Sequence, residues 1–495
     1  MSDAMDSAEQ WAARHFGQVD LKDKRLNRRA VKVARQMAEN PSASIPDQCG
    51  GHWGDIKAIY RLLADPYATF ERMAQCHWQQ TREAAASTAA GGGGVVLFVQ
   101  DTTWLSYGHH PHTRGLGRHG RGKNKRDRGL HLHNVLAVKP LEQPTHQPGQ
   151  QPQAEVLGLA YAQLWARPQQ LLNADQAARS RRRKSPDRES LRWSRAVAEV
   201  GAAPPGCRYL HVGDREADLY ELYEQTMALS GVGFVIRGKH DRCALLGHDT
   251  PEVVGTRDIK GSGLKKLVRS LPATAGLSLE IDGHNGRCAR TAELKISYSP
   301  VTLYSPMVRG RRQKALRCWC VRVFEPNAPQ GTQPLEWVLL TSEPVKNAED
   351  ALRIVRYYHW RWLIEEYHRC LKSGCCVEHS QLQSRQSLEP LVGMLSVVAT
   401  RLLQLKNESR IHPRALAIEH AAPEMVQMLC RLTGQHAETL SLREFVCGVA
   451  KQGGFIGRKG DGEPGWLTLW RGWQKLLYRC EGYRMAQSAG DVGKG

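Results

Sequence analysis

The spacing of apolar residues divides the chain into regions of different character. Residues 8–90 and the residues after about 386 carry apolar positions at helical spacing, and helical segments are also expected at 187–201 and 216–229. Buried strands are expected at short apolar runs, namely residues 95–100, 130–138, 156–165, 208–213, 233–238 and 336–342. The alternation of these strands and helices predicts a mixed α/β sheet.

Residues 241–334 differ because apolar and polar positions alternate there, as at Leu294, Ile296 and Tyr298, which predicts an inserted β-rich subdomain. Four domains follow from the whole pattern. They are a helical N-terminal domain at 1–90, a core at 91–240 and 335–385, a β-rich insertion at 241–334, and a helical C-terminal domain at 386–495. Glycines 91–94 are expected to form the hinge before the core.

A stripe of polar residues lies on the single helix predicted for residues 356–372, RYYHWRWLIEEYHRCLK. At about 100° per residue, Tyr358, Arg361, Glu365 and Lys372 share an arc of about 60°. The opposite face is apolar and consists of Trp360, Leu363, Ile364, Tyr367 and Leu371. A carboxylate among cations suits a metal or a phosphate, although an ordinary solvated face with i,i+4 pairs produces the same stripe.

Two aspartates follow the predicted strands. Asp101 ends the apolar run VVLFVQ, and Asp214 follows RYLHVG. Strand ends of one sheet lie close together, and carboxylates beside apolar runs need a positive partner. With Glu365 they would suit two Mg²⁺ ions that hold the attacking and leaving oxygens of a phosphodiester. Each aspartate alone also suits a turn or a helix N-cap, and Glu216 and Asp218 compete with Asp214.

The charge of the chain points to a polyanionic partner. Lys and Arg number 69 against 49 Asp and Glu, a net charge of +20 over 495 residues, which favours nucleic acid. The segment from Lys22 to Arg35 holds seven Lys or Arg against one Asp, and its Arg25, Arg28 and Arg29 are expected to contact DNA rather than form a solvated face. No run of 18 apolar residues and no signal-peptide pattern appears, so we expect a cytoplasmic, nucleoid-associated protein without a membrane span.

In their order along the chain, these motifs resemble those of bacterial DDE cut-and-paste transposases of the insertion-sequence-four family, in particular the Tn-five type. The family signature Y-x2-R-x3-E-x6-K is matched by Tyr358, Arg361, Glu365 and Lys372. Its two aspartate motifs are matched by QDTTWLSY around Asp101 and by DREAD from Asp214. Further similar stretches are RGKH at 237–240, PLEWVLLTSEPV at 334–345, LSVVATRLLQLK at 395–406 and GGFIGRKGDGEPGWLTLWRGW at 453–473. The resemblance covers most of the chain and is weakest in the N-terminal region, the Pro/Gln-rich loop at 141–153 and the basic loop at 114–128.

The resemblance implies an RNase H-like (retroviral-integrase-like) catalytic core in which Asp101, Asp214 and Glu365 bind two Mg²⁺ ions, with Mn²⁺ able to substitute. Members of the family nick each transposon end, cut the opposite strand through a hairpin, and join the freed 3′-OH to target DNA. The partners implied are double-stranded DNA, as inverted-repeat ends and target, and a second copy of the chain in a synaptic homodimer.

The resemblance also assigns DNA contacts. Tyr358, Arg361 and Lys372 would hold phosphates, and Arg237 and Lys239 would line the DNA path. Trp337 would stack in the place of a flipped base, although core packing beside a strand also fits it. A stripe at helical spacing, Trp466, Trp470, Trp473 and Leu477, fits an internal core by itself and a dimer element once the family is considered.

Two other functions remain compatible with the sequence. One is a catalytically silent DNA-binding regulator derived from a transposase, because a fold can outlast its chemistry. The other is an RNase H-like nuclease, which would release DNA ends without joining them.

Overall fold

A computed structural model describes residues 7–90, 94–119, 127–141, 153–167, 185, 187–248, 262–281, 290–306, 315–458 and 463–491. Outside these residues lie most of the predicted glycine hinge and of the Pro/Gln-rich loop, the centre of the basic loop at 114–128, and the basic cluster at 309–314. The chain divides into two compact units. The first comprises Met1–Ala84, Thr102–Ala177 and Leu363–Gly495, and the second comprises Ala85–Asp101 and Ala178–Trp362.

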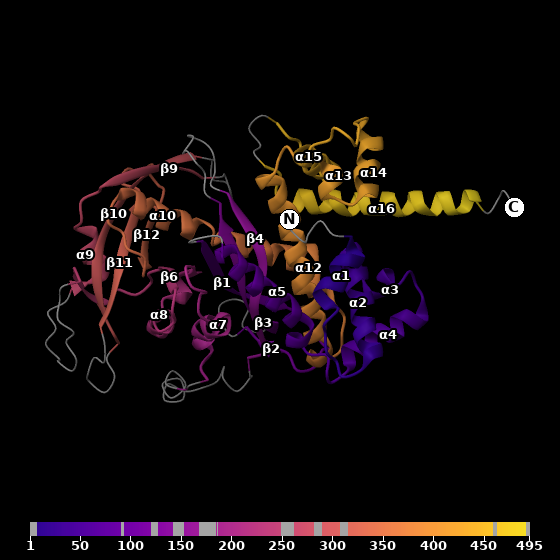
Figure 1. The fold of residues 1–495 in the computed structure, drawn as a ribbon, viewed down its shortest axis with the longest axis horizontal. Helices are drawn as coiled ribbons and strands as arrows, with labels where there is room; N and C mark the ends of the chain where they lie inside the picture. Colours follow the sequence, from indigo (N-terminus) through magenta and orange to yellow (C-terminus); the bar gives the residue numbers. More distant parts are fainter. Residues whose placement is uncertain are drawn as a thin grey trace. The chain divides into compact units, whose positions relative to one another are not determined.

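The N-terminal part of the first unit is helical, which confirms the expectation for residues 8–90. Its helices are α1 (Ala8–Phe16), α2 (Lys24–Glu39), α3 (Ile45–Gln48), α4 (Trp53–Ala64) and α5 (Phe70–Ala90), drawn in indigo in Figure 1. Helix α1 begins with a capping box between Ser7 and Gln10, and α2 begins where the Asp23 side chain accepts from two backbone N–H groups. Both starts are therefore encoded locally.

The first unit also contains three neighbouring strands of the sheet, and one long helix packs on one of them. Strand β3 (Arg128–Pro140) pairs antiparallel with β2 (Gly117–Arg118) and β4 (Ala154–Trp165), and α12 (Arg385–Ile411) packs on β4. By length and composition α12 passes the test for a membrane span, but 83% of the window that passes it is buried inside the protein. Its apolar surface is therefore explained by packing in a core.

A cluster of helices forms the C-terminal part of the first unit (Figure 1). It contains α13 (Ala417–His420), α14 (Pro423–Thr433), α15 (Leu442–Gln452) and α16 (Trp466–Asp491). Trp470 is buried, and Trp473 and Leu477 pack against the core of this cluster, so these three members of the predicted stripe are internal. The end of α16 nearest the C-terminus extends past the other helices and exposes Tyr478, Tyr483 and Met485.

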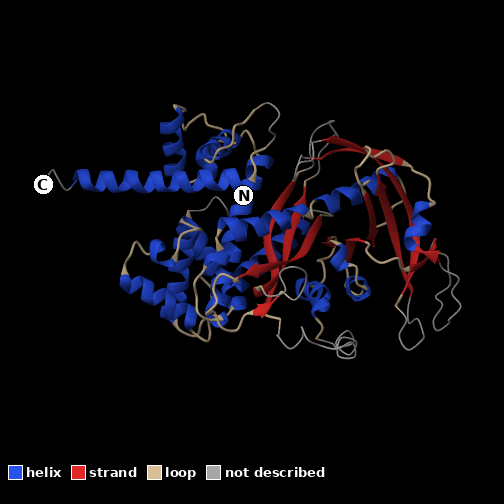
Figure 2. Ribbon diagram, turned by 180° about the vertical axis from the view of Figure 1, so that it is seen from behind, coloured by secondary structure: helices blue, strands red, loops and turns tan. Residues whose placement is uncertain are grey.

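The second unit is built on a mixed sheet, as predicted. Strands β1 (Val95–Ser106), β5 (Arg208–Gly213) and β6 (Val232–Arg237) are parallel neighbours, and β12 (Glu336–Thr341) pairs antiparallel with β6. Figure 2 draws the strands in red. The sheet continues through strands of the predicted β-rich insertion, namely β11 (Ala315–Phe324), β10 (Arg290–Tyr304), β7 (Cys243–Leu246), β8 (Ser262–Gly263) and, beside β10, β9 (Ala275–Ile281).

Short helices pack on this sheet. They are η4 (Glu189–Leu191), α7 (Arg192–Val200), η5 (Arg215–Ala217), α8 (Tyr220–Met227), α9 (Leu264–Arg269) and α10 (Ala348–His359). Helix α8 contacts β6, and α10 contacts β5, β6 and the three strands from β10 to β12. The class is therefore mixed α/β with a large mixed sheet and helical terminal regions.

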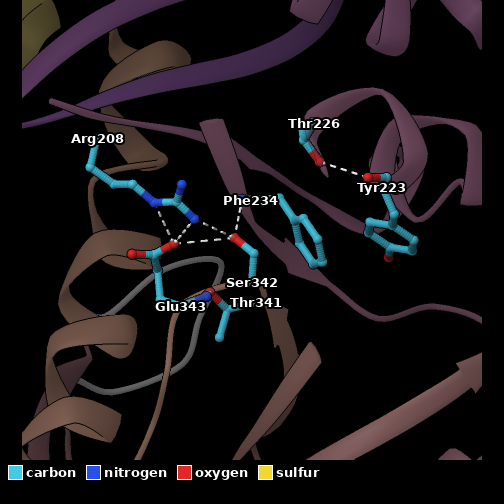
Figure 3. A network of polar contacts seen from close by, with 7 residues as sticks. All are labelled: Arg208, Tyr223, Thr226, Phe234, Thr341, Ser342 and Glu343. Carbon is cyan, nitrogen blue, oxygen red and sulfur yellow. Dashed lines mark hydrogen bonds and ion pairs between the residues drawn. The ribbon is translucent and has the colours of Figure 1, made fainter. Parts of the chain in front are cut away.

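A polar network fixes the order of three neighbouring strands at one end of the sheet (Figure 3). Arg208, the first residue of β5, donates from Nε and Nη2 to Glu343 Oε1 at 2.9 and 2.6 Å. Ser342 Oγ accepts from Phe234 N on β6 at 3.0 Å. Because Arg208 begins β5, this network lies at the end of that strand opposite to Asp214 and leaves the carboxyl end clear.

The prediction of one continuous helix over residues 356–372 was wrong. Helix α10 ends at His359, α11 runs over Trp362–Arg369, and a π-helix, η6, occupies Cys370–Gly374. The whole predicted apolar face, from Trp360 to Leu371, is nevertheless buried. Tertiary packing of those side chains therefore outweighed local helix propensity.

Candidate functional site

The register of β1 and β5 brings two predicted carboxylates to neighbouring positions. Val95 pairs with Arg208 and Val99 with Val212, so the offset is constant (208 − 95 = 212 − 99 = 113). If the same offset is extended two residues past the paired segment, Asp101 aligns with Asp214 (101 + 113 = 214). Both aspartates are half-buried and lie just beyond the paired segment, at its carboxyl end.

The expectation that the strand ends at Asp101 was wrong. Strand β1 continues to Ser106, and β3 lies beside it in the sheet order. Thr102 and Thr103 favour strand structure because they are β-branched, and a second partner strand supplies the hydrogen bonds that β5 no longer provides. Asp101 is thus held by extended backbone on both sides rather than by a loop.

Asp214 is the N-cap of η5, where its Oδ1 accepts from Glu216 N at 2.8 Å. The N-cap alternative is therefore correct, but a carboxylate has two oxygens and one cap leaves acceptor capacity for a further partner. Glu216, which competed with Asp214 for the ligand role, is exposed and pairs with Arg192 at 2.8 Å. Asp218, the other competitor, is buried and bound by Arg242 at 2.7 Å.

Guanidinium groups gather around Tyr358 in the second unit. The Arg361 guanidinium lies 5.9 Å from the centre of the Tyr358 ring, and the Tyr358 hydroxyl is hydrogen-bonded to Arg237. Burial lowers the pKa of Arg237, and the like charges of Arg215 and Arg361 lower it further, while Tyr358 opposes the change. Cations held this close favour an anion beside them.

Arg215 was missed by the sequence reasoning, which assigned Tyr358, Arg361 and Arg237 but not this residue. The feature of the sequence that could have indicated Arg215 is its position directly after Asp214, where η5 begins. The Arg215 side chain is exposed. Arg237 itself is fixed by its backbone position at the end of β6 and by donation to Glu336 O at 3.2 Å.

Trp337, the predicted stacking residue, lies on β12 opposite Val323 of β11 and is half-buried. Its neighbour Glu336 accepts from Arg322 Nε at 2.9 Å and from Arg269 Nη2 at 2.5 Å. The indole is therefore neither sealed in the core nor fully exposed. Lys239, predicted to line the DNA path, is exposed just after β6.

Glu365 and Lys372 belong to the first unit. Glu365 is half-buried on α11, and Lys372 lies on the π-helix η6. The Lys372 ammonium donates to Trp104 O at 2.6 Å and lies 3.6 Å from the Glu378 carboxylate. Trp104 lies on the part of β1 that belongs to the same unit as Lys372, so Lys372 is fixed against that part of the strand.

Helix α11 is anchored by the residue next to Glu365. The buried Glu366 accepts from Lys406 Nζ at 3.1 Å and from Arg410 Nη2 at 3.4 Å, both on α12. Burial alone would raise the pKa of Glu366, but the attraction of Lys406 and Arg410 outweighs it and holds the pKa below its usual value. The two adjacent glutamates therefore differ in environment, with Glu366 paired inside and Glu365 partly open.

The two neighbouring aspartates fit a hard divalent cation, which prefers carboxylate oxygens. In the part of the chain that the structure describes, no group of three or more His, Cys, Asp and Glu side chains is close enough to hold a metal ion.

The basic helix α2 presents some of its predicted DNA contacts. Arg25 and Arg28 are exposed, whereas Arg29 pairs with Asp55 at 2.7 Å and Lys32 pairs with the same carboxylate at 2.9 Å. Arg25 and Arg28 are therefore better placed than Arg29 to meet a phosphate.

Comparison with known families places two domains at the two ends of the chain. Residues 8–67 match the transposase DNA-binding domain, and residues 432–493 match the Transposase Tn5 dimerisation domain. These two domains support a Tn5-like transposase. The first match covers α1 to α4 and so includes the basic helix, and the second includes α15 and α16. DNA binding and homodimer formation are supported on the same grounds.

Proposed function

We propose that this protein is a DDE transposase of the insertion-sequence-four family with an RNase H-like core, and that it moves an insertion sequence by cut-and-paste transposition. The observation that carries the proposal is the parallel register of β1 and β5, which ends two residues before Asp101 and Asp214, in a chain whose two ends match transposase domains. Glu365 completes the proposed set, with α11 fixed by the buried Glu366 beside it.

In this proposal Asp101, Asp214 and Glu365 hold two Mg²⁺ ions. When bound, such ions make a water or a 3′-OH a better nucleophile and stabilise the leaving oxygen of a phosphodiester. The protein's own contribution is to hold the DNA in line for that displacement. Carboxylates on adjacent strands and a rigid helix suit that task because they lose little freedom on binding.

Cationic residues bind the phosphates on either side of the scissile bond. Arg237 and Arg361 lie at Tyr358, Arg215 adds a like charge near Arg237, and a phosphate bound there would offset the repulsion that these charges exert on Arg237. Lys372 is held by Trp104 O and can turn its remaining protons to a second phosphate. Trp337 stacks on an extruded base, and Lys239 continues the DNA path.

The reaction follows in four displacements. Water first breaks the phosphodiester at the transposon end and leaves a 3′-OH. That hydroxyl then attacks the opposite strand, so that a hairpin forms as the flanking DNA leaves. After a second water opens the hairpin, the same 3′-OH attacks a target phosphodiester and joins the element to target DNA.

A homodimer carries out these steps on two paired ends. Trp470 is buried in the helical cluster and Trp473 and Leu477 pack against its core, so we assign the subunit contact to the face of α16 that exposes Tyr478 and Met485.

Substitution of the three carboxylates tests the proposed site. We expect Asp101→Ala, Asp214→Ala and Glu365→Ala each to lower Mg²⁺-dependent nicking of matched end DNA by about 10³-fold or more, because each removes several kcal/mol of charge stabilisation. Binding of the same DNA without divalent cation should change by no more than about threefold.

Glu216→Ala is the matched control, because Glu216 is an exposed carboxylate in the same segment that pairs with Arg192. It should nick at nearly the wild-type rate. Full nicking activity in any one of the three alanine variants would remove that residue from the site.

A further inference from the structure

Asp218 is the most completely bound carboxylate near the proposed site. It is 1% exposed and lies four residues after Asp214 in the segment GDREAD. Its Oδ2 accepts from the backbone N–H groups of Lys239 and His240 at 2.7 and 2.8 Å. Its Oδ1 accepts from Arg242 Nη2 at 2.7 Å and from the Tyr223 hydroxyl at 2.8 Å.

The donors to Asp218 come mainly from one turn, residues 239–242, which leaves the carboxyl end of β6. Arg242 reinforces the link, since its Nη2 also donates to the Asp218 carbonyl at 2.7 Å. The turn after β6 is thereby tied to the segment after β5, and these two strands are parallel neighbours with Gly213 paired to Ile236. One carboxylate thus fixes the spacing between Asp214 and the turn.

The same turn is tied to the β-rich insertion. Asp241 Oδ1 accepts from Lys265 N at 2.8 Å, and Leu264 N donates to Arg242 O at 2.8 Å, both at the start of α9. Lys265 Nζ also donates to Lys239 O at 2.8 Å. The main chain of Lys239 is therefore held from two directions while its side chain remains exposed.

A role for Asp218 as a metal ligand does not agree with these contacts. Both oxygens already accept hydrogen bonds, and the Arg242 guanidinium balances the charge inside a buried site. Burial would raise the pKa of Asp218, but Arg242 and the backbone donors hold it below its usual value, so the carboxylate stays charged.

We propose that Asp218 is a positioning residue that holds the turn 239–242 so that the Lys239 side chain meets a DNA phosphate at a fixed distance from Asp214. The proposal rests on the proposed function, because it assumes end DNA as the ligand. Asp218 itself touches no DNA and acts through the backbone of Lys239.

The salt dependence of end-DNA binding tests this role. Each phosphate contact contributes about 0.9 to the slope of log Kd against log salt concentration. We expect Lys239→Ala to weaken binding about tenfold and to lower the slope by about 1. Asp218→Asn keeps the size of the side chain but loses its charge and one acceptor, and it should produce the same two changes.

The double variant Asp218→Asn/Lys239→Ala separates positioning from general stability. If Asp218 acts through Lys239, the double variant should bind no more than about twofold more weakly than Lys239→Ala alone. Glu325→Gln is the matched control, because Glu325 is also a buried carboxylate that accepts from an arginine, Arg290 at 3.0 Å, but lies on neither segment. It should leave the salt slope at the wild-type value.

Arg242→Gln provides a second route if Asp218→Asn fails to fold, since it loosens the turn while leaving Asp218 bound by two backbone N–H groups. An unchanged salt slope in folded Asp218→Asn or Arg242→Gln would overturn the proposal, and so would full additivity in the double variant. Wild-type protein that binds no end DNA would instead remove the proposed function together with this inference.

Discussion

At the scale of single residues, the proposed site contains both carboxylates, which suit metal cations, and guanidinium groups, which suit phosphates. Asp101 and Asp214 both lie just beyond the paired segment of β1 and β5, and carboxylate oxygens suit divalent cations. The Arg237 guanidinium contacts Tyr358 and is affected by the like charges of Arg215 and Arg361, which a bound phosphate would offset.

Arg215 gives the prediction for this scale. Removing its guanidinium should weaken phosphate binding, so Arg215→Ala is expected to lower end-DNA affinity about 5- to 20-fold and to reduce the salt slope by about 1. Fluorescence anisotropy with labelled end DNA measures both quantities. Arg195→Ala is the control, an exposed arginine on α7 that lies 3.6 Å from Asp187, and it should bind as wild type does. Equal effects of the two substitutions would contradict the assignment.

Sequence reasoning reached some of these residues and not others. Asp101 and Asp214 stood out in the sequence because each follows an apolar run that locates a strand, although β1 continues past Asp101 to Ser106. The competition between Asp214, Glu216 and Asp218 was not resolvable, because it depends on donors from a turn more than 20 residues away in sequence, such as Lys239 N. Arg215 was missed because its companions come from β6 and α10, which only the folded chain brings together.

At the scale of elements, the break after α10 and the anchoring of α11 determine where Glu365 points. Strand positions were predicted within a few residues, since buried strands are read from composition. The break between α10 and α11 was not predictable, because the segment from Trp360 to Trp362 contains neither Pro nor Gly. The break follows instead from the packing of the buried apolar side chains of the two helices. The ion pair between Glu366 and Lys406 was not predictable either, because it joins residues 40 positions apart in the sequence.

Glu366 gives the prediction for elements. Glu366→Gln leaves the buried Lys406 and the half-buried Arg410 without this counter-charge and should lower the free energy of unfolding of the first unit by about 3–5 kcal/mol. Nicking should fall as well, because α11 carries Glu365. Urea denaturation followed by circular dichroism measures the loss of stability. Glu349→Gln, at an exposed glutamate in the first turn of α10, is the control and should change the free energy of unfolding by no more than about 0.5 kcal/mol.

The pH dependence of that loss has a definite sign. The folded pKa of Glu366 lies below its ordinary value of 4.5, so the stability from its charge is present above that value and is lost as the pH falls through the folded pKa. The stability difference between wild type and Glu366→Gln should therefore be constant near neutral pH and shrink in acid below about pH 4.5. A difference that grows in acid would contradict the assigned ion pair.

At the scale of the whole molecule, the chain joins a DNA-binding domain and a dimerisation domain to the sheet that carries the aspartates. Met485→Asp on the exposed face of α16 should raise the dimer dissociation constant about 10-fold or more, because a charge is costly in an apolar contact. Sedimentation velocity measures the change. Met227→Asp, at a methionine that is 47% exposed on α8, is the matched control and should leave the dimer intact.

The most direct measurement is a strand-transfer assay with wild-type protein. The substrate is the short inverted-repeat DNA that flanks the gene, offered with supercoiled target DNA and Mg²⁺, and the products are resolved by denaturing electrophoresis. Our account predicts nicks at the repeat boundary, a transient hairpin, and covalent joining of the 3′ end to target DNA. Cleavage that releases ends without joining would identify a nuclease, and binding without cleavage would identify a silent regulator; either result would contradict the account.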